Sequence, residues 1–122
     1  MTPDPAAFAQ RWAEEWNAHD LNQVLAHYAS EVVFRSPVAA RVLPGSDGIV
    51  RGLDALRHYW STALALTPDL HFEVLEVYSG VDTLVIRFRN QRNEVRCEVL
   101  TFRDGLIVEG EGTFLSRPPS EG

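Results

Sequence analysis

Glu98 is the side chain in this sequence best placed to do chemistry, and it lies in the run 94–114, EVRCEVLTFRDGLIVEGEGTF. The alternating apolar residues of this run predict two strands joined by a turn at 103–105. Because successive side chains of a strand point to opposite faces, Glu98 shares a face with Leu100 and Phe102. A carboxyl group beside two large apolar side chains lies either on a solvated face or in a pocket.

Each location gives the Glu98 carboxyl a different role. In a pocket, loss of water would raise its pKa and keep it protonated near neutral pH. It would then serve as a general acid or as a hydrogen-bond donor to a ligand oxygen. On a solvated face, it would pair across the sheet with Arg87 or Arg89. The sequence leaves both interpretations open.

Aromatic residues recur at helical spacing in two segments and could form the walls of a pocket. Such stripes pack in the core of a helical layer, and the walls of ligand pockets are built from the same residue types. Tyr28 and Ser36 are the predicted polar helpers of Glu98, and the Tyr28 hydroxyl needs a partner if it is buried. The predicted wall consists of Trp12, Trp16, Phe34, Tyr59, Trp60, Phe88, Leu100 and Phe114, with Gly110 and Gly112 leaving space in the cavity.

The sequence does not favour nucleophilic or metal-dependent chemistry. Cys97 has the opposite strand parity to Glu98, and no histidine can be placed beside it to activate its thiol. The spacing of His27, His58 and His71 matches no known metal motif. No glycine-rich phosphate loop is present either. We therefore predict neither a metal nor a cofactor.

Length and composition limit the class of protein. A chain of 122 residues with 45% hydrophobic residues predicts one domain, 1–122, with an ordered core at about 5–116 and a flexible tail at 117–122. The net charge of −6 argues against a nucleic-acid surface, which is typically basic. No apolar run reaches the roughly 18 residues of a membrane span, and the N-terminus does not resemble a signal peptide. With Cys97 as the only cysteine, a reducing cytoplasm is the simplest location.

Helix and strand signals alternate early in the chain and then give way to strands alone. Asp4 and Asp20 predict the starts of two helices, the first ending at about Asn17. The other predicted elements are a strand at 31–36, a loop at 37–52, a helix at 53–66 and strands at 70–79, 83–90, 94–103 and 106–116. A change of apolar parity within the first of these last four strands predicts a bulge.

The short connections between the last four strands predict an antiparallel meander. Helices that are segregated from such a meander indicate the α+β class. The three predicted helices carry apolar stripes that need a surface to cover. We therefore expect three helices packed on a strongly curved antiparallel sheet with one concave face.

Four stretches carry a recognisable family pattern: FAQRWAEEWNAHDL at 8–21, YASEVVF at 28–34, SP at 36–37 and RGLDALRHYW at 51–60. In them the chain resembles the nuclear transport factor 2-like superfamily, and within it the SnoaL-like polyketide cyclases and ketosteroid isomerases. The resemblance covers about residues 5–116. It implies a cystatin-like α+β barrel, a cone in which a bent sheet wraps around the helices and leaves a pocket open at one end. It also implies a homodimer formed through the outer face of the sheet.

The isomerase motif of that family is only partly present. Its oxyanion-hole tyrosine corresponds to Trp12, its proton-shuttling aspartate to Ser36 and its second carboxylic acid to Glu98. Trp12 can donate a hydrogen bond but cannot shuttle a proton, and an unassisted serine is not a base near neutral pH. Only Glu98 keeps the acid, which in ketosteroid isomerases is held protonated by an apolar site. The resemblance therefore does not imply authentic ketosteroid isomerase activity.

Two functions from different classes are consistent with these patterns. The first is a domain that binds a hydrophobic small molecule, with no nucleic-acid or membrane partner. If this domain is an enzyme, we expect a cofactor-free acid/base isomerase, cyclase or hydratase acting on a hydrophobic carbonyl or hydroxyl compound. The alternative is a non-catalytic ligand-binding or dimerisation module of the same fold.

Overall fold

The computed structural model of the chain describes residues 4–116, and the tail predicted as flexible, 117–122, lies outside this range. In chain order the elements are α1 (Pro5–Asn17), α2 (Leu21–Leu25), β1 (Tyr28–Arg35), α3 (Pro37–Val42), β2 (Ile49–Arg51), α4 (Leu53–Leu66), β3 (Glu73–Ser79), β4 (Thr83–Arg89), β5 (Val95–Arg103) and β6 (Leu106–Phe114). The predicted order of helices followed by a meander is confirmed, with one additional helix and one additional strand between β1 and α4.

The first helix begins as its sequence predicts. The Asp4 carboxylate accepts a hydrogen bond from the Ala7 amide at 3.0 Å. Pro5 takes a position in the first turn where no amide donor is needed. The buried face of α1 consists of Phe8, Ala9, Trp12, Ala13 and Trp16. This apolar stripe packs the helix against the sheet.

The break between α1 and α2 ties the helices to the segment that leads into β3. The Asn17 side chain donates a hydrogen bond to the Phe72 carbonyl at 3.0 Å and accepts one from the Phe72 amide at 2.7 Å. His19 Nε2 donates to the Leu70 carbonyl oxygen at 3.0 Å. The backbone of this otherwise irregular segment is therefore fixed by side chains of the helix break.

The segment 37–52 is not the single loop that the sequence predicts. Ser36 Oγ accepts a hydrogen bond from the Val38 amide at 3.1 Å and so begins α3, with Pro37 in its first turn. After a turn, β2 pairs antiparallel with β1. A helix of six residues and a strand of three are too short to give a periodic pattern in the sequence. Tertiary contacts therefore determine their conformation.

The six strands form one sheet in the order β2-β1-β6-β5-β4-β3. The four strands β3 to β6 are the predicted antiparallel meander. The predicted bulge in its first strand is confirmed by a register shift between Val74 and Glu76. β1 and β6, however, run parallel, so the sheet is not antiparallel throughout. Because β1 and β6 lie far apart in the chain, no local pattern indicates their pairing.

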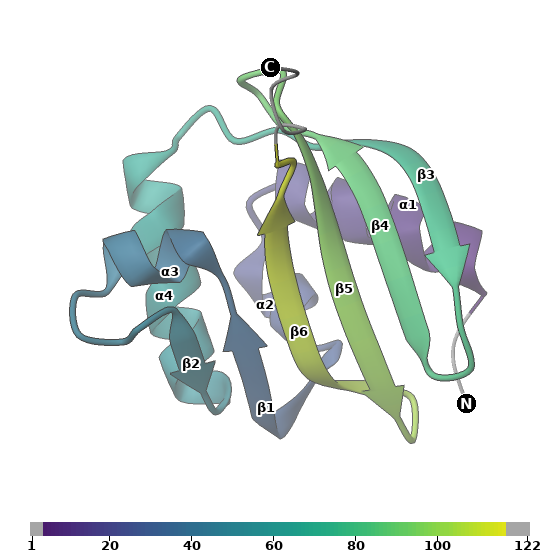
Figure 1. The fold of residues 1–122 in the computed structure, drawn as a ribbon, viewed down its shortest axis with the longest axis horizontal. Coiled ribbons are helices and arrows are strands. Elements are labelled where there is room, and N and C mark those ends of the chain that lie inside the picture. The colour runs from purple at the N-terminus through teal and green to yellow at the C-terminus, as the bar shows by residue number, and fades with distance from the viewer. Residues whose placement is uncertain (1–3, 117–122) are drawn as a thin grey trace, which may run out of the picture.

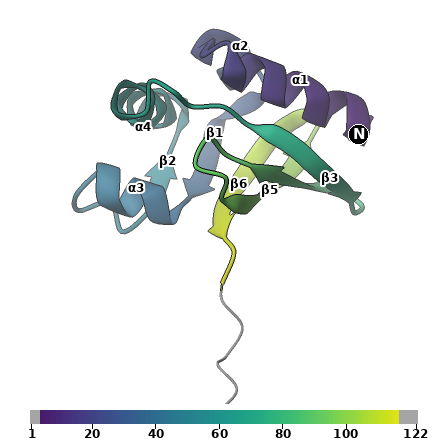
Figure 2. The ribbon, with the colours of Figure 1, turned by 90° about the horizontal axis from the view of Figure 1, so that it is seen from above.

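Helices α1, α2 and α4 all lie on one side of the sheet (Figures 1 and 2). In Figure 1, α1 and α2 lie behind the strands, and Figure 2 shows the sheet curving around them. The side chains that fill the space between the layers are fully buried, among them Leu56 of α4 and Leu84, Ile86 and Leu100 of the sheet. This arrangement confirms the α+β class. No helix within residues 4–116 combines the length and the apolar character needed to cross a membrane.

Gly110 makes room for a side chain of β1 and not for a ligand. A Cβ atom at this position would lie 2.6 Å from Cδ2 of Phe34 and 3.5 Å from Cδ2 of Leu100. Phe34 is the direct partner of Gly110 in the parallel β1–β6 pair. The expectation that Gly110 leaves space in a cavity is therefore wrong, because the Phe34 ring fills that space.

We expect Gly110→Ala to lower the free energy of unfolding by about 1–3 kcal/mol, because the new methyl group would overlap the Phe34 ring. Urea-induced unfolding measures the change. Gly80→Ala is the matched control, since a Cβ there would make only ordinary contact with Thr83 at 3.7 Å. Equal stability of the two variants would contradict the filled space.

Candidate functional site

A cavity of about 260 Å³ lies between the helices and the sheet. Its aromatic lining residues are Trp16, Phe34, Tyr59, Trp60, Phe72, Phe88 and Phe114. Its polar and charged lining residues are Ser36, Arg41, Thr67, Asn90, Gln91, Arg92, Arg96, Glu98 and Thr113. A hollow that combines aromatic side chains with convergent polar groups has the composition of a small-molecule site.

Glu98 faces this cavity from the middle of β5. Its neighbours across the sheet are Ile86 on β4 and Gly112 on β6, so it points to the concave side. The two arginines that could have paired with it on a solvated face have other partners. Arg87 contacts Glu76 at 2.6 Å and Arg89 contacts Glu73 at 3.2 Å. The structure therefore favours the pocket interpretation of Glu98 over the solvated pair.

The environment of Glu98 changes its protonation. Burial raises the pKa of its carboxyl to about 8, and the positive charge of Arg96 opposes this shift only in part. Within the described chain, the carboxyl takes part in no hydrogen bond or ion pair that would stabilise its anion. Near neutral pH it is therefore predominantly a neutral acid, able to donate a hydrogen bond into the cavity.

Ser36 and Tyr59 form a second polar group in the cavity wall. The Tyr59 hydroxyl donates a hydrogen bond to Ser36 Oγ at 3.4 Å, and the Val38 amide donates to the same oxygen. Because Ser36 Oγ already accepts twice, its own proton is available to donate. Burial raises the pKa of Tyr59, and its hydrogen bond to Ser36 opposes the shift. The sequence predicted Tyr59 only as a wall residue, whereas the structure gives it this polar contact.

Gly112 separates Ser36 from Glu98. A Cβ atom on Gly112 would lie 3.2 Å from Ser36 Oγ and 3.8 Å from Glu98 Oε1. Both oxygens thus flank the bare backbone of one glycine. A ligand oxygen that approached this point would meet two potential hydrogen-bond donors.

Tyr28 lies behind the cavity wall and not in it. Its ring meets the edge of Trp60 at a centroid distance of 5.2 Å. Its hydroxyl is buried and lacks a hydrogen-bond partner within residues 4–116. Burial raises the pKa of Tyr28 well above its usual range, and the nearby Glu98 carboxyl contributes to the same shift. Tyr28 therefore neighbours the site without lining it.

The structure brings most of the predicted wall residues together at the cavity, and three lie elsewhere. The predicted wall residues that line it are Trp16, Phe34, Tyr59, Trp60, Phe88, Gly112 and Phe114. Trp12 stacks on Phe72 at a centroid distance of 5.3 Å and so supports the wall from behind. Gly110 lies between Phe34 and Leu100, its partners on β1 and β5. Phe72, which the sequence did not single out, takes a place in the wall.

Three arginines line the cavity although the sequence did not predict them there. Arg96 lies two positions before Glu98 on β5, so its strand parity could have placed it on the same face. Arg41 belongs to α3, the helix that the sequence did not predict. Arg92 belongs to the turn between β4 and β5. All three line the cavity.

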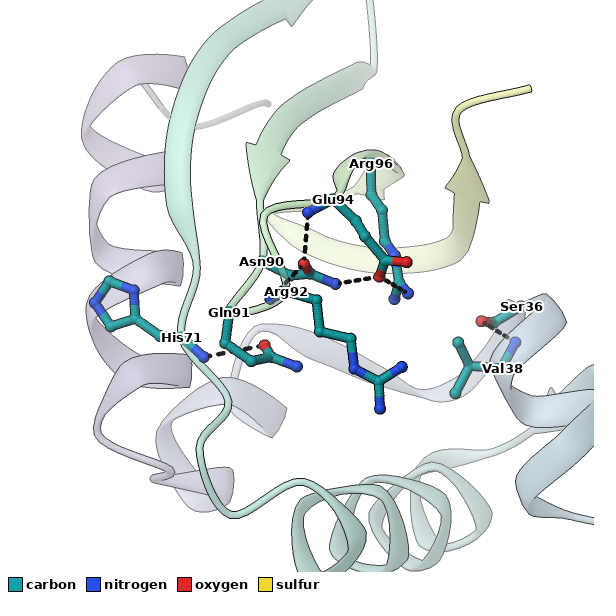
Figure 3. Close-up of polar contacts among 8 residues, drawn as sticks. All are labelled: Ser36, Val38, His71, Asn90, Gln91, Arg92, Glu94 and Arg96. Atoms are coloured by element: carbon teal, nitrogen blue, oxygen red, sulfur yellow. Dashed lines mark hydrogen bonds and ion pairs between the residues drawn. The ribbon is translucent and has the colours of Figure 1, made fainter. Parts of the chain in front are cut away.

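The turn that carries Arg92 is built around Asn90 (Figure 3). Asn90 Oδ1 accepts hydrogen bonds from the amides of Arg92 and Glu94 at 3.0 and 2.9 Å, and Asn90 Nδ2 donates to Glu94 Oε1 at 3.0 Å. Glu94 Oε1 also accepts from Arg96 Nη2 at 3.0 Å. Gln91 Oε1 accepts from the His71 amide at 3.3 Å. These contacts fix the direction in which the turn presents its side chains.

The histidines lie apart from the cavity. His27 Nε2 contacts Glu15 Oε1 at 2.8 Å. None of the three histidines that the sequence analysis considered as metal ligands, His27, His58 and His71, lines the cavity. In the part of the chain that the structure describes, no group of three or more His, Cys, Asp and Glu side chains is arranged to hold a metal ion.

Comparison with known proteins points to one family. The model of the SnoaL-like domain matches residues 9–110 of this chain. A SnoaL-like protein from Burkholderia thailandensis is 32% identical, with a TM-score of 0.85 over 93% of this chain and 100% of the other. TerC, crystallised with polyporic acid, is 16% identical, with a TM-score of 0.74 over 91% of this chain and 92% of the other. An NTF2-like protein from Burkholderia pseudomallei is 19% identical, with a TM-score of 0.71 over 88% of each chain. No curated protein matches the sequence.

The raised pKa of Glu98 predicts a pH-dependent stability. The folded protein keeps a proton that the unfolded chain releases above about pH 4.5, so stability falls as the pH rises from that value through about 8. We expect Glu98→Gln, which cannot ionise, to remove a loss of a few kcal/mol between about pH 6 and about pH 9. Urea unfolding at both pH values measures the difference.

Glu111→Gln is the control, because Glu111 is an exposed carboxylate on the neighbouring strand β6. It should keep the pH dependence of the unsubstituted protein. If Glu98→Gln loses as much stability with rising pH as Glu111→Gln does, the Glu98 carboxyl is not protonated in the folded state at neutral pH.

Proposed function

This chain belongs to the SnoaL-like family, and from that premise we propose that its cavity binds a hydrophobic small molecule through a carbonyl or hydroxyl oxygen. The observation that carries the proposal is Glu98. A carboxyl that lacks a counter-charge, is largely withdrawn from water and opens onto an aromatic cavity is costly for a fold unless a ligand uses it. Its protonated form supplies the donor that such a ligand oxygen needs.

The walls determine what kind of molecule fits. Trp16 and Trp60 meet edge to face at a centroid distance of 4.9 Å, and Phe72 and Phe88 lie 4.6 Å apart. These aromatic pairs leave flat apolar surfaces against which a ring system can pack. In the same fold, TerC was crystallised with polyporic acid, a small organic molecule. That structure supports a small-molecule role for the cavity, although the two chains share only 16% identity.

If the bound compound is converted, the chemistry that best suits the site is acid catalysis without a cofactor. The Glu98 O–H would donate a hydrogen bond to a carbonyl oxygen and stabilise the negative charge that develops there when a neighbouring carbon gives its proton to a water molecule. Ser36, at the position of the proton-shuttling aspartate of ketosteroid isomerases, and Tyr59 contribute hydroxyl groups to the cavity wall. The residues therefore favour an acid-assisted isomerisation, cyclisation or hydration.

We expect an aryl ketone such as tetralone to bind and to report the donor directly. A hydrogen bond from Glu98 weakens the C=O bond, so the infrared C=O stretch of bound tetralone should fall below its value in an apolar solvent. In Glu98→Leu, which has a similar size and no donor, the stretch should return towards the apolar value. Infrared difference spectra of the two complexes measure this.

Glu111→Gln serves as the control and should leave the bound C=O stretch unchanged. If the stretch is the same in the unsubstituted protein and in Glu98→Leu, Glu98 is not the donor. If neither tetralone nor a panel of related aryl ketones binds, the proposed function itself is wrong.

A second candidate function, a dimerisation module, is favoured by the outer face of the sheet. There Val85 lies opposite Val99 and Thr83 lies opposite Thr101, and all four side chains are only partly exposed. A strip of small apolar and hydroxyl side chains of this kind can pack against a second copy. We propose that the chain forms a homodimer through this face.

We expect sedimentation velocity to show a dimer at micromolar concentration and Val85→Glu to shift it to a monomer, because the substitution would bury a charge in the interface. The matched control is Val81→Glu, since Val81 is 91% exposed in the β3–β4 turn. A monomeric unsubstituted protein, or an equal effect of both substitutions, would contradict this interface.

A further inference from the structure

We propose that the natural ligand carries an anionic group, a carboxylate or an ionised acidic hydroxyl, which Arg41, Arg92 and Arg96 bind at one end of the cavity. The inference rests on the proposed function, because it assigns a chemical class to the ligand of the same cavity. It makes the ligand amphipathic: an apolar body between the aromatic walls, an oxygen at Glu98 and an anion at the arginines.

The first argument is the balance of charge around the cavity. The chain as a whole has a net charge of −6. The cavity nevertheless has three arginines among its lining residues, and within residues 4–116 Glu98 is the only acidic side chain that lines it. Glu98 is mostly neutral near pH 7 because burial raises its pKa to about 8. Three cations around one hollow of an acidic protein repel one another, and an anion inside that hollow would relieve the repulsion.

The second argument is that only one of the three guanidinium groups has an acidic partner within residues 4–116. Arg96 contacts Glu94, whose side chain is half exposed, at 3.0 Å. No ion pair joins Arg41 or Arg92 to an acidic side chain in the same part of the chain. Two guanidinium groups therefore remain available to an incoming anion.

The third argument is that two of the arginines pack against an aromatic ring and the third extends from an ordered turn towards the same space. Arg96 lies over the Phe114 ring with its Cζ atom 4.3 Å from the centroid, and Arg41 approaches the same ring at 5.6 Å. Arg92 is carried by the turn that Asn90 organises. Figure 3 shows its side chain extending into the space that separates this turn from Ser36 and Val38. The Arg96 and Arg41 guanidinium groups, packed against the Phe114 ring, lose less freedom when they bind a carboxylate than unsupported ones would.

The test compares naphthalene carboxylate with naphthalene carboxamide, which have the same ring system and nearly the same shape but differ in charge. Isothermal titration calorimetry at neutral pH measures both affinities. We expect the carboxylate to bind about tenfold more tightly than the carboxamide, because charge-assisted hydrogen bonds to arginine are stronger than neutral ones. Added sodium chloride should weaken the binding of the carboxylate and leave the affinity for the carboxamide unchanged.

Arg41→Gln and Arg92→Gln should each lower the affinity for the carboxylate by about fivefold or more. Each should change the affinity for the carboxamide by less than about twofold. Arg51→Gln is the matched control, since Arg51 is an exposed arginine on β2 that does not line the cavity. It should leave both affinities unchanged.

Two results would overturn the inference, and they differ in what else they affect. The proposed anion site is wrong if the carboxamide binds as tightly as the carboxylate, or if both arginine variants lower the affinities for the two compounds equally. The small-molecule function would stand in either case. If neither naphthalene compound nor tetralone binds, the proposed function and the anion site both fail.

Discussion

A carboxyl group that is removed from water without a counter-charge is stable mainly in its protonated form, and this constraint governs the site around Glu98. The position of Glu98 between Ile86 and Gly112 is fixed by the register of three antiparallel strands. A shift of one residue in β5 would turn the carboxyl to the outer face and bring Cys97 inwards. The acid in the cavity therefore depends on the pairing of the whole meander.

The second feature that follows from this constraint is the separation of charge inside one small hollow. The charge of Arg96 acts on Glu98, yet the Arg96 guanidinium contacts Glu94 and the Phe114 ring. Burial raises the pKa of Glu98 more than Arg96 lowers it, so the acid keeps its proton near neutral pH. Asn90 maintains this arrangement, because it holds both the turn backbone and the Glu94 carboxylate. A neutral donor and a cationic group thus coexist in the lining of a single cavity.

Much of this architecture could be predicted from local patterns. Asp4 with Pro5 marked the start of α1, and strand parity gave Glu98 the same face as Leu100. The elements that could not be predicted are either very short or formed by segments far apart in the sequence. α3 is too short for a periodic signal, so Arg41 was missed with it. The parallel β1–β6 pair has no local signature, and so the ring of Phe34 beside Gly110 was not foreseen.

The cavity can form only after the hydrogen bonds of the helix break have joined two distant segments of the chain. Phe72 and Leu70 line it, and both are held by Asn17 and His19, which lie 55 and 51 residues away in sequence. Closing chain segments of that length costs entropy that a local hairpin does not have to overcome. Neither the N-terminal helices nor the meander contains the cavity by itself. In terms of contact order, the cavity is one of the least local features of this chain, formed only where its two halves meet.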